Sequence, residues 1–250
     1  MDTGLQGKTV LITGASRNLG RLAALVFARE GANLAICTSA KMKELNHVAE
    51  EARALGVTVV AEQCDVTDSD AVCRFVNIAR EKLGSVDVAI NLAVHRAERK
   101  FLEESFETWN RTIAVNLSGP GNVCRSVIPL MIERRWGRII NFSGIAPYLG
   151  TTNLGVGAAK AMVKLGIVGF TRGLAREFGE FNITANCVGP GDIQRDFDPL
   201  ATKKPPRSNK PIPRNGKPEE VASLLVYLAS ENAGYITGQC YLVNGGAYFQ

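Results

Sequence analysis

Short runs of apolar residues, rich in Val and Ile, alternate with longer helical patterns along almost the whole 250-residue chain. Seven runs have the length of a strand, and they lie at 9–12, 34–37, 58–61, 86–90, 138–142, 183–188 and 241–243. Because these runs are almost continuously apolar, we expect strands that are covered on both faces. Regular alternation of this kind is typical of a parallel, doubly wound α/β sheet flanked by helices, whose strand carboxyl ends share one ligand-binding edge.

Helical patterns fill the intervals at about 19–30, 41–55, 68–83, 105–134, 155–178 and 218–230. In the longest of them, the sequence Gly119-Pro120-Gly121 predicts an interruption. Residues 1–250 are predicted to form a single domain, because the alternation continues through the whole chain. The segment 192–217 departs from this rhythm and holds five prolines. A loop of this length favours a lid or a substrate-binding loop, and a disordered insertion is the alternative.

The composition excludes several classes of protein. The formal net charge is +5, from 29 Lys and Arg against 24 Asp and Glu, and no helical pattern carries the basic stripe of a nucleic-acid-binding protein. No apolar run approaches the ~18–20 residues of a membrane span, and the first residues lack a signal-peptide pattern, so we expect a cytoplasmic protein. The six cysteines are scattered without a CxxC pair, which favours reduced core thiols over disulfides or a metal site.

The segment from Thr13 to Gly20, after the first expected strand, has the character of a phosphate-binding turn. Glycines at Gly14 and Gly20 let the backbone approach a pyrophosphate, and the following helix offers N–H groups and positive potential. The strand–turn–helix context at the start of an alternating chain favours a dinucleotide site over an ordinary turn between a strand and a helix.

Several short motifs together make the chain resemble the short-chain dehydrogenase/reductase family. The turn is similar to the family's Thr-Gly-x-x-x-Gly-x-Gly, except that Asn18 replaces the middle glycine, and asparagine tolerates the left-handed backbone. The further matches are Cys64-Asp65-Val66, Asn91-Leu92-Ala93-Val94, Trp109-Asn110, Val115-Asn116-Leu117, Asn141-Phe142-Ser143-Gly144, Pro190-Gly191, Gly238-Gln239 and Val243-Asn244-Gly245-Gly246. This resemblance covers nearly the whole chain. It implies a Rossmann-type domain similar to the 3-oxoacyl-carrier-protein reductases, with a nicotinamide dinucleotide cofactor.

The resemblance also implies which residues bind the cofactor. They are Gly14, Ser16, Arg17, Asn18, Gly20, Thr38, Ser39, Asp65, Val66, Asn91, Ala93, Lys160, Pro190 and Gly191. At the end of the second expected strand, Thr38, Ser39 and Ala40 include no carboxylate that would bind a ribose 2′-hydroxyl and repel a 2′-phosphate. Arg17 and Lys41 are positive groups that could face such a phosphate, so the pattern favours NADP(H) over NAD(H).

The family's chemistry uses an Asn, a Ser, a Tyr and a Lys, with the Tyr and Lys four residues apart on one face of a helix. By resemblance, Asn116, Ser143 and Lys160 hold three of these positions. The Tyr is missing, because Val156 stands four residues before Lys160 and thirteen after Ser143. The resemblance therefore implies an NADP(H)-dependent carbonyl/alcohol oxidoreductase with an atypical active site. The missing Tyr matters because a positioned general acid typically contributes ~10²–10⁴ in rate.

Three explanations of the missing Tyr remain open. Another residue can supply the proton, and the candidates are Tyr148, five residues after Ser143, and His95, after the fourth expected strand. Alternatively, the chain is a catalytically inactive or non-redox relative that binds a nucleotide. Finally, Val156 can be an engineered or accidental substitution in an otherwise ordinary reductase.

The charge of the 192–217 loop bears on the substrate, because it holds seven cations against three carboxylates. The cations are Arg195, Lys203, Lys204, Arg207, Lys210, Arg214 and Lys217, with Arg96, Arg99 and Lys100 near the fourth strand. This bias is compatible with an anionic or carrier-bound small-molecule substrate, while small ketones and alcohols, or simple solvation of the loop, are the alternatives. Small residues at Gly166, Gly169 and Gly173 permit close helix approach, and with the resemblance they imply a homo-oligomer, in particular a tetramer.

Overall fold

The computed structural model describes residues 2–96, 100–150, 157–194 and 210–249. Within these residues, seven strands form one sheet in the order β3-β2-β1-β4-β5-β6-β7, and every neighbouring pair is parallel. The strands are β1 (Thr9–Thr13), β2 (Asn33–Thr38), β3 (Val59–Gln63), β4 (Val88–Asn91), β5 (Gly137–Phe142), β6 (Ile183–Pro190) and β7 (Cys240–Val243). Each expected strand is present, and the predicted doubly wound parallel sheet is confirmed.

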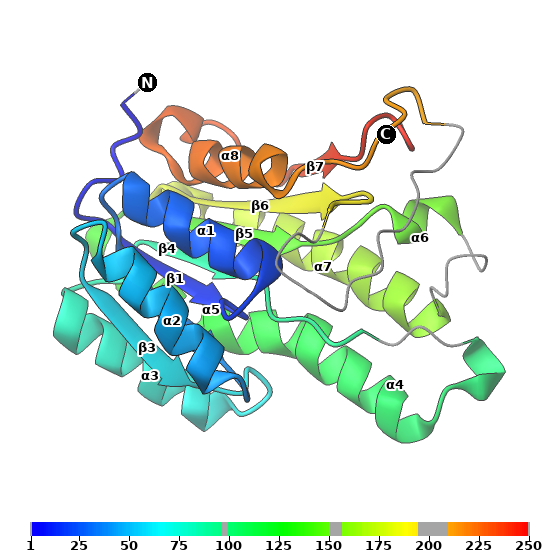
Figure 1. The fold of residues 1–250 in the computed structure, drawn as a ribbon, viewed down its shortest axis with the longest axis horizontal. Coiled ribbons are helices and arrows are strands. Elements are labelled where there is room, and N and C mark those ends of the chain that lie inside the picture. The colour runs from blue at the N-terminus through cyan, green and yellow to red at the C-terminus, as the bar shows by residue number, and fades with distance from the viewer. Residues whose placement is uncertain (1, 97–99, 151–156, 195–209, 250) are drawn as a thin grey trace.

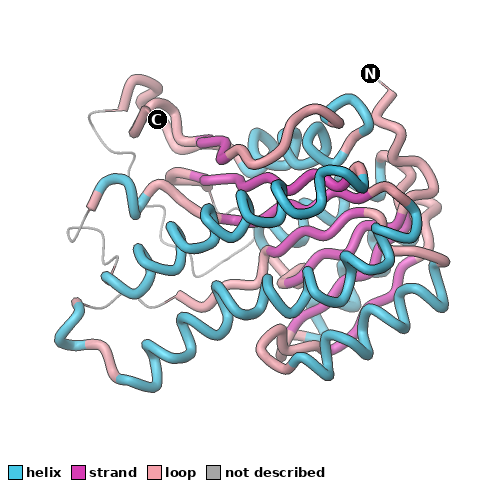
Figure 2. The backbone as a smooth tube through the Cα atoms, turned by 180° about the vertical axis from the view of Figure 1, so that it is seen from behind, coloured by secondary structure: helices cyan, strands magenta, loops and turns pink. Residues whose placement is uncertain are grey.

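Two layers of helices cover the sheet (Figures 1 and 2). The longer helices are α1 (Asn18–Arg29), α2 (Met42–Arg53), α3 (Ser69–Leu83), α4 (Phe106–Ile113), α5 (Gly119–Arg134), α7 (Ala158–Phe178) and α8 (Pro218–Ala229). Helices α1, α2 and α8 pack together on one face, and α3, α5 and α7 lie on the other. Because both faces are covered, the strands are largely apolar, as the sequence indicated, although β5 and β6 also bury Arg138, Asn141 and Asn186.

The core lies on both sides of the central strands. Ile12 of β1 and Ile36 of β2 point into the cluster under α1, α2 and α8, whereas their neighbours Leu11 and Ala35 point into the cluster under α3 and α5. The strand order reverses between β1 and β4, which pair directly. In doubly wound sheets this switch point, at the carboxyl ends of the strands, is where ligands bind.

The interruption expected near Gly119-Pro120-Gly121 is present and lies directly before this sequence. Helices α4 and α5 are joined by a π-helical turn, Ala114–Ser118, and Pro120 lies in the first turn of α5. Proline has no N–H to donate to the carbonyl of Asn116, so the α-helical ladder breaks before Pro120 rather than at it. The short helix α6 (Ala146–Leu149) was not predicted.

Candidate active site

The turn between β1 and α1 folds as a tight backbone cradle. Gly14 has a φ of +68° and Asn18 a φ of +48°, so asparagine adopts the left-handed backbone, as expected where it replaces glycine. A Cβ atom at Gly14 would lie 2.9 Å from the backbone of Ala93, and one at Gly20 would collide with the carbonyl oxygen of Gly14. Both positions therefore exclude side chains, which is the property that a pyrophosphate-binding turn requires.

The same turn is anchored to β4 across the switch point. Thr13 Oγ1 accepts hydrogen bonds from the backbone N–H groups of Leu92 and Ala93, both at 3.1 Å. Asn91 ends β4 and donates through Nδ2 to Asn141 Oδ1 at 2.8 Å. Its own Oδ1 is buried and has no hydrogen-bond partner among the described residues. The structure thus brings the two segments that were expected to bind a dinucleotide together at one edge.

The amino terminus of α1 opens onto this cradle. Arg17 is the exposed N-cap residue, and its side chain does not cap the helix, so the first N–H groups and the helix dipole favour an anion there. The hydroxyls of Ser16 and Thr38 lie 3.5 Å apart and join the turn to the end of β2. The buried Oδ1 of Asn18 lacks a hydrogen-bond partner in the described part of the chain, which suits a hydroxyl or N–H group of a ligand.

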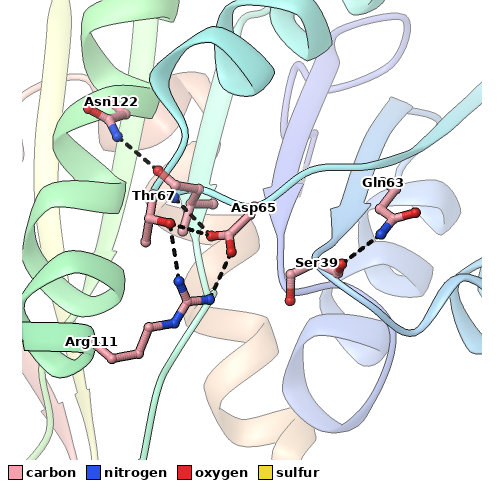
Figure 3. A network of polar contacts seen from close by, with 7 residues as sticks. Ser39, Gln63, Asp65, Thr67, Arg111 and Asn122 are labelled. Carbon is pink, nitrogen blue, oxygen red and sulfur yellow. Dashed lines mark hydrogen bonds and ion pairs between the residues drawn. The ribbon is translucent and has the colours of Figure 1, made fainter. Parts of the chain in front are cut away.

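The end of β2 carries hydroxyl groups rather than a carboxylate. Thr38 is buried, Ser39 is exposed, and the carbonyl of Ser39 accepts a hydrogen bond from Gln63 Nε2 at 3.0 Å (Figure 3). Lys41 forms an exposed ion pair with Glu44 at 3.4 Å, which reduces its availability to a phosphate. Arg17 is therefore the stronger of the two cations that were expected to face a 2′-phosphate.

Asp65 follows β3 and is held in a network of polar contacts (Figure 3). Arg111 Nη2 lies 2.8 Å from Asp65 Oδ2, and Thr67 donates to Oδ1 through both its N–H and its hydroxyl. Burial acts to raise the pKa of the Asp65 carboxyl, but the hydrogen bonds from Arg111 and Thr67 outweigh it and hold this pKa below its ordinary value. Asn122 Nδ2 donates to the Val66 carbonyl at 2.9 Å. The Asp65 carboxylate is thus ionised, and hydrogen bonds hold the Asp65-Val66 segment in place.

Asn116 lies in the π-helical turn and is buried. Its Nδ2 donates to the carbonyls of His95 and Thr112, each at 2.9 Å, so the loop after β4 is held against this turn. The buried Oδ1 of Asn116 has no hydrogen-bond partner within the described ranges. A π turn with an unsatisfied polar atom often marks a functional site. His95 contributes its backbone here, and its side chain is half-buried.

Ser143 follows β5 and faces α7, where its hydroxyl donates to the carbonyl of Lys164 at 2.9 Å. Lys164 is buried, and its Nζ donates to the carbonyl of Phe142 at 2.7 Å. Burial lowers the pKa of Lys164 to about 8, and the charges of Lys160 and Arg96 act in the same direction. Lys160 is half-buried one turn before it. Our sequence reasoning missed Lys164, although the Lys160–Lys164 pair repeats the four-residue spacing of the family's Tyr and Lys.

Tyr148, in α6, brings a phenol to the same place. Its Oη donates to Cys240 Sγ at 3.6 Å and lies close to the Ser143 side chain, while its ring stacks on Tyr248 with centroids 5.2 Å apart. Burial, together with the Cys240 thiol, raises the pKa of Tyr148 above its ordinary value, so the phenol stays protonated. Of the two candidate replacements for the missing acid, Tyr148 lies close to Ser143. Val156 itself lies outside the described residues.

The strand ends on the other side of Ser143 close the site. Pro190 ends β6, and the N–H of Gly191 donates to the carbonyl of Val243 at 2.9 Å. A Cβ atom at Gly191 would lie 2.9 Å from the Cα of Asn244. This pair is therefore packed tightly against the segment that follows β7.

The described part of the 192–217 loop is less positive than the sequence suggested. The buried Lys210 pairs with Asp192 at 3.0 Å, and Arg214 pairs with Glu220 at 2.6 Å. The hydrogen bond from Arg214 lowers the pKa of Glu220 to about 2, so this partner is ionised at neutral pH. Residues 195–209, with Arg195, Lys203, Lys204 and Arg207, and residues 97–99, with Arg99, lie outside the described residues.

Comparison with known proteins agrees with this geometry. A family model described as enoyl-(acyl carrier protein) reductase matches residues 14–248. The chain is 35% identical to the 3-oxoacyl-[acyl-carrier-protein] reductase FabG of Thermotoga maritima over 97% of its length and 98% of the relative's, and 33% identical to that of Aquifex aeolicus, over 99% and 100%. The structure of a doubly substituted mutant of a Serratia marcescens short-chain dehydrogenase/reductase superimposes with a TM-score of 0.89 at 31% identity, covering 97% of this chain and 98% of that one.

The chain therefore belongs to the short-chain dehydrogenase/reductase family, a class of oxidoreductases that act on carbonyl and hydroxyl groups. Within that family it is similar to the 3-oxoacyl-carrier-protein reductases over nearly its full length. In the part of the chain that the structure describes, no helix has the length and apolar character to cross a membrane.

Proposed function

We propose that this protein is an NADP(H)-dependent carbonyl/alcohol oxidoreductase in which Tyr148 replaces the missing Tyr as the proton donor. The observation that carries the proposal is the position of the Tyr148 phenol, which donates to Cys240 Sγ and lies close to Ser143, whose hydroxyl in turn donates to the carbonyl of the buried Lys164. These groups lie at the carboxyl ends of the strands, as the dinucleotide cradle does. The substrate class that suits this site and the reductase relatives is a 3-oxoacyl thioester, with small ketones as the simpler alternative.

The cradle fits the cofactor by three features: the absence of room for side chains at Gly14 and Gly20, the uncapped start of α1, and the unsatisfied Oδ1 of Asn18. The pyrophosphate would lie against Gly14, Ser16, Arg17, Asn18 and Gly20. Thr38 and Ser39, together with Arg17, would flank the 2′-phosphate. Asp65 and Val66 would contact the adenine. The nicotinamide half would lie against Asn91, Ala93, Lys160, Pro190 and Gly191. When bound, the cofactor supplies or accepts the hydride.

The chain's own residues handle the proton and the substrate oxygen. Ser143 holds this oxygen once its hydroxyl turns from the Lys164 carbonyl, to which it donates in the structure, and Tyr148 gives the oxygen a proton from Oη. Because burial raises the pKa of the Tyr148 phenol, the group is protonated at neutral pH and available as a donor in reduction, although the raised pKa makes the proton transfer itself less favourable. Lys164, whose Nζ donates to the carbonyl of Phe142 next to Ser143, supplies a positive charge on this side of the site as negative charge develops on the substrate oxygen.

The test combines cofactor titration with a panel of substrates. NADPH and NADH binding, followed by fluorescence, should show tighter binding of NADPH. Consumption of NADPH is then measured with 3-oxoacyl thioesters and small ketones for the native chain and for Val156→Tyr. If Tyr148 is the donor, the native chain turns over and Val156→Tyr does not accelerate it. An acceleration of ~10² or more would show instead that the site is an ordinary reductase lacking its acid.

A second candidate function is a non-redox, nucleotide-binding relative, and the observation that favours it is Val156 in place of the acid. This candidate predicts that NADPH binds while neither the native chain nor Val156→Tyr consumes it. His95→Ala is a useful control in the same panel, because the structure places only the backbone of His95 in contact with Asn116.

We also propose that the protein assembles as a homotetramer through the outer face of α7. Met162 and Leu165 are 43% and 48% exposed there, and a Cβ atom at Gly169 or Gly173 would meet nothing within 4 Å. These small residues thus do not serve packing on the chain's own sheet. An exposed apolar helix face that carries glycines without side chains suits the close approach of a second helix. Sedimentation at micromolar concentration tests the assembly, and a monomer would contradict it.

A further inference from the structure

Two cysteines that lie 53 residues apart in the sequence are direct neighbours in the sheet. Cys187 of β6 pairs in register with Cys240 of β7, and the N–H of Cys187 donates to the carbonyl of Gln239 at 2.8 Å. Residues paired in register point to the same face, so the two thiols are close enough to interact with each other. Neighbouring strands lie about 4.8 Å apart. This spacing falls within the ~4.4–6.8 Å that a disulfide requires between Cα atoms.

The two thiols have unlike surroundings. Cys240 is only partly buried, and it interacts with the Cys187 thiol and accepts a hydrogen bond from the Tyr148 phenol, with the charge of Arg172 nearby. These contacts lower the pKa of Cys240 to about 7, with the Cys187 thiol as the largest contributor. Cys187 is fully buried beside Lys164, and its contact with Cys240, together with burial, raises its pKa. Cys240 is thus the thiolate that an oxidant reaches first, and Cys187 is the resolving thiol.

We propose that Cys187 and Cys240 form a reversible, peroxide-sensitive disulfide at the substrate edge of the sheet. The Cys240 thiolate attacks one oxygen of a peroxide, the O–O bond breaks, and a sulfenic acid forms as the other oxygen leaves, taking up a proton, as water or an alcohol. The Cys187 sulfur then attacks the Cys240 sulfur and expels water, forming the S–S bond. Two thiols are oxidised by two electrons, the peroxide is reduced, and a dithiol reverses the change.

Oxidation of the two cysteines would affect the proposed active site by changing the contacts of Tyr148. The disulfide removes the thiolate that accepts the Tyr148 hydrogen bond and ties β7 to β6 beside Pro190. Loss of turnover on oxidation rests on the proposed function, whereas formation of the disulfide does not. A second pair of interacting thiols, Cys37 and Cys64, differs from this pair in strand register and in exposure. Cys37 pairs in register with Glu62 rather than with Cys64, and both thiols are at most 3% exposed.

The experiment treats the full-length protein with hydrogen peroxide and measures intact mass and non-reduced peptide maps. We expect loss of two hydrogens, a peptide linking residues 187 and 240, and recovery with dithiothreitol. Cys187→Ser should stop at a sulfenic acid that dimedone traps on Cys240, and Cys73→Ser, which removes an exposed thiol remote from the pair, should behave as the native chain. A linkage of 37 to 64 instead, or no linkage at all, would overturn the proposal.

A parallel measurement of NADPH consumption separates this proposal from the proposed function. If the disulfide forms and turnover falls by ~10-fold or more, both are supported. If the disulfide forms in a protein that never consumes NADPH, the redox pair stands and the reductase assignment fails. If turnover is normal and peroxide leaves both cysteines reduced, the reductase assignment stands and the redox pair fails.

Discussion

Replacing the buried Lys164 by methionine should change the pH dependence of stability in a predictable direction. Its pKa falls from 10.5 to about 8 on folding, chiefly because of burial. At 1.36 kcal/mol for each pKa unit, the folded protein loses about 3 kcal/mol when it holds this side chain charged. Methionine fills similar space without the charge but leaves the Phe142 carbonyl without its donor, which costs ~1–3 kcal/mol. At pH 7 we expect Lys164→Met to be up to ~2 kcal/mol more stable than the native chain.

The sign reverses as the pH rises. Below pH 8 the lysine is protonated in both states, and the folded state carries the full cost of burial. Between pH 8 and 10.5 the unfolded chain keeps a proton that the folded protein has released, so the native chain gains stability relative to Lys164→Met. Urea unfolding at pH 7 and at pH 10, at one protein concentration, measures this gain, which should reach about 3 kcal/mol at the upper end.

Lys160→Met, which removes a half-buried lysine from the same helix, is measured beside Lys164→Met as the control. If Lys164→Met and the native chain change in parallel from pH 7 to pH 10, the burial argument is refuted. NADPH turnover by Lys164→Met should fall by ~10-fold or more although this variant is more stable, since the charge near Ser143 is lost.

Three further changes test the cradle, the assembly and the core. Gly20→Ala places a Cβ atom against the Gly14 carbonyl and should weaken NADPH binding at least ~10-fold and lower stability by ~1–3 kcal/mol. A Cβ atom at Gly121 meets nothing within 4 Å, so Gly121→Ala should have neither effect. Fluorescence titration measures the binding, and thermal unfolding measures the stability. Gly169→Arg should convert the proposed tetramer to smaller species in sedimentation, because the bulk of the arginine blocks the exposed face of α7. Asp87→Ala removes the buried carboxylate that binds Thr9, Ser85 and Arg134, and should cost ~3–5 kcal/mol in urea unfolding; a cost below ~1 kcal/mol would contradict that role.

Much of the fold was predictable because local chemistry and global topology agree in this chain. The apolar, β-branched runs mark strands that are buried on both faces, so all seven were found with boundaries within about two residues. The left-handed backbone at Asn18 followed from the chemistry of asparagine alone. By contrast, α6 has four residues and no periodicity to detect, and the π turn depends on a proline four residues beyond Asn116.

The candidate site was only partly predictable, because burial is decided by tertiary packing. Lys164 has the same residue type as Lys160, and only the packing of α7 against β5 distinguishes the buried lysine from the half-buried one. Likewise, the pairing of Cys187 with Cys240 depends on strand register, which a separation of 53 residues does not reveal. For the same reason, the cation excess of the 192–217 loop could not reveal that Lys210 is paired with Asp192 in space.

The most direct test of the relocated acid is NADPH consumption with a 3-oxoacyl thioester, compared between the native chain, Tyr148→Phe and Tyr248→Phe. The Tyr248 ring stacks on Tyr148, so its variant removes a neighbouring phenol without removing the proposed donor. We predict that Tyr148→Phe loses ~10²–10⁴ in turnover with NADPH binding unchanged, while Tyr248→Phe stays within ~10-fold of the native rate. Equal turnover by the native chain and Tyr148→Phe would contradict the assignment of Tyr148 as the proton donor.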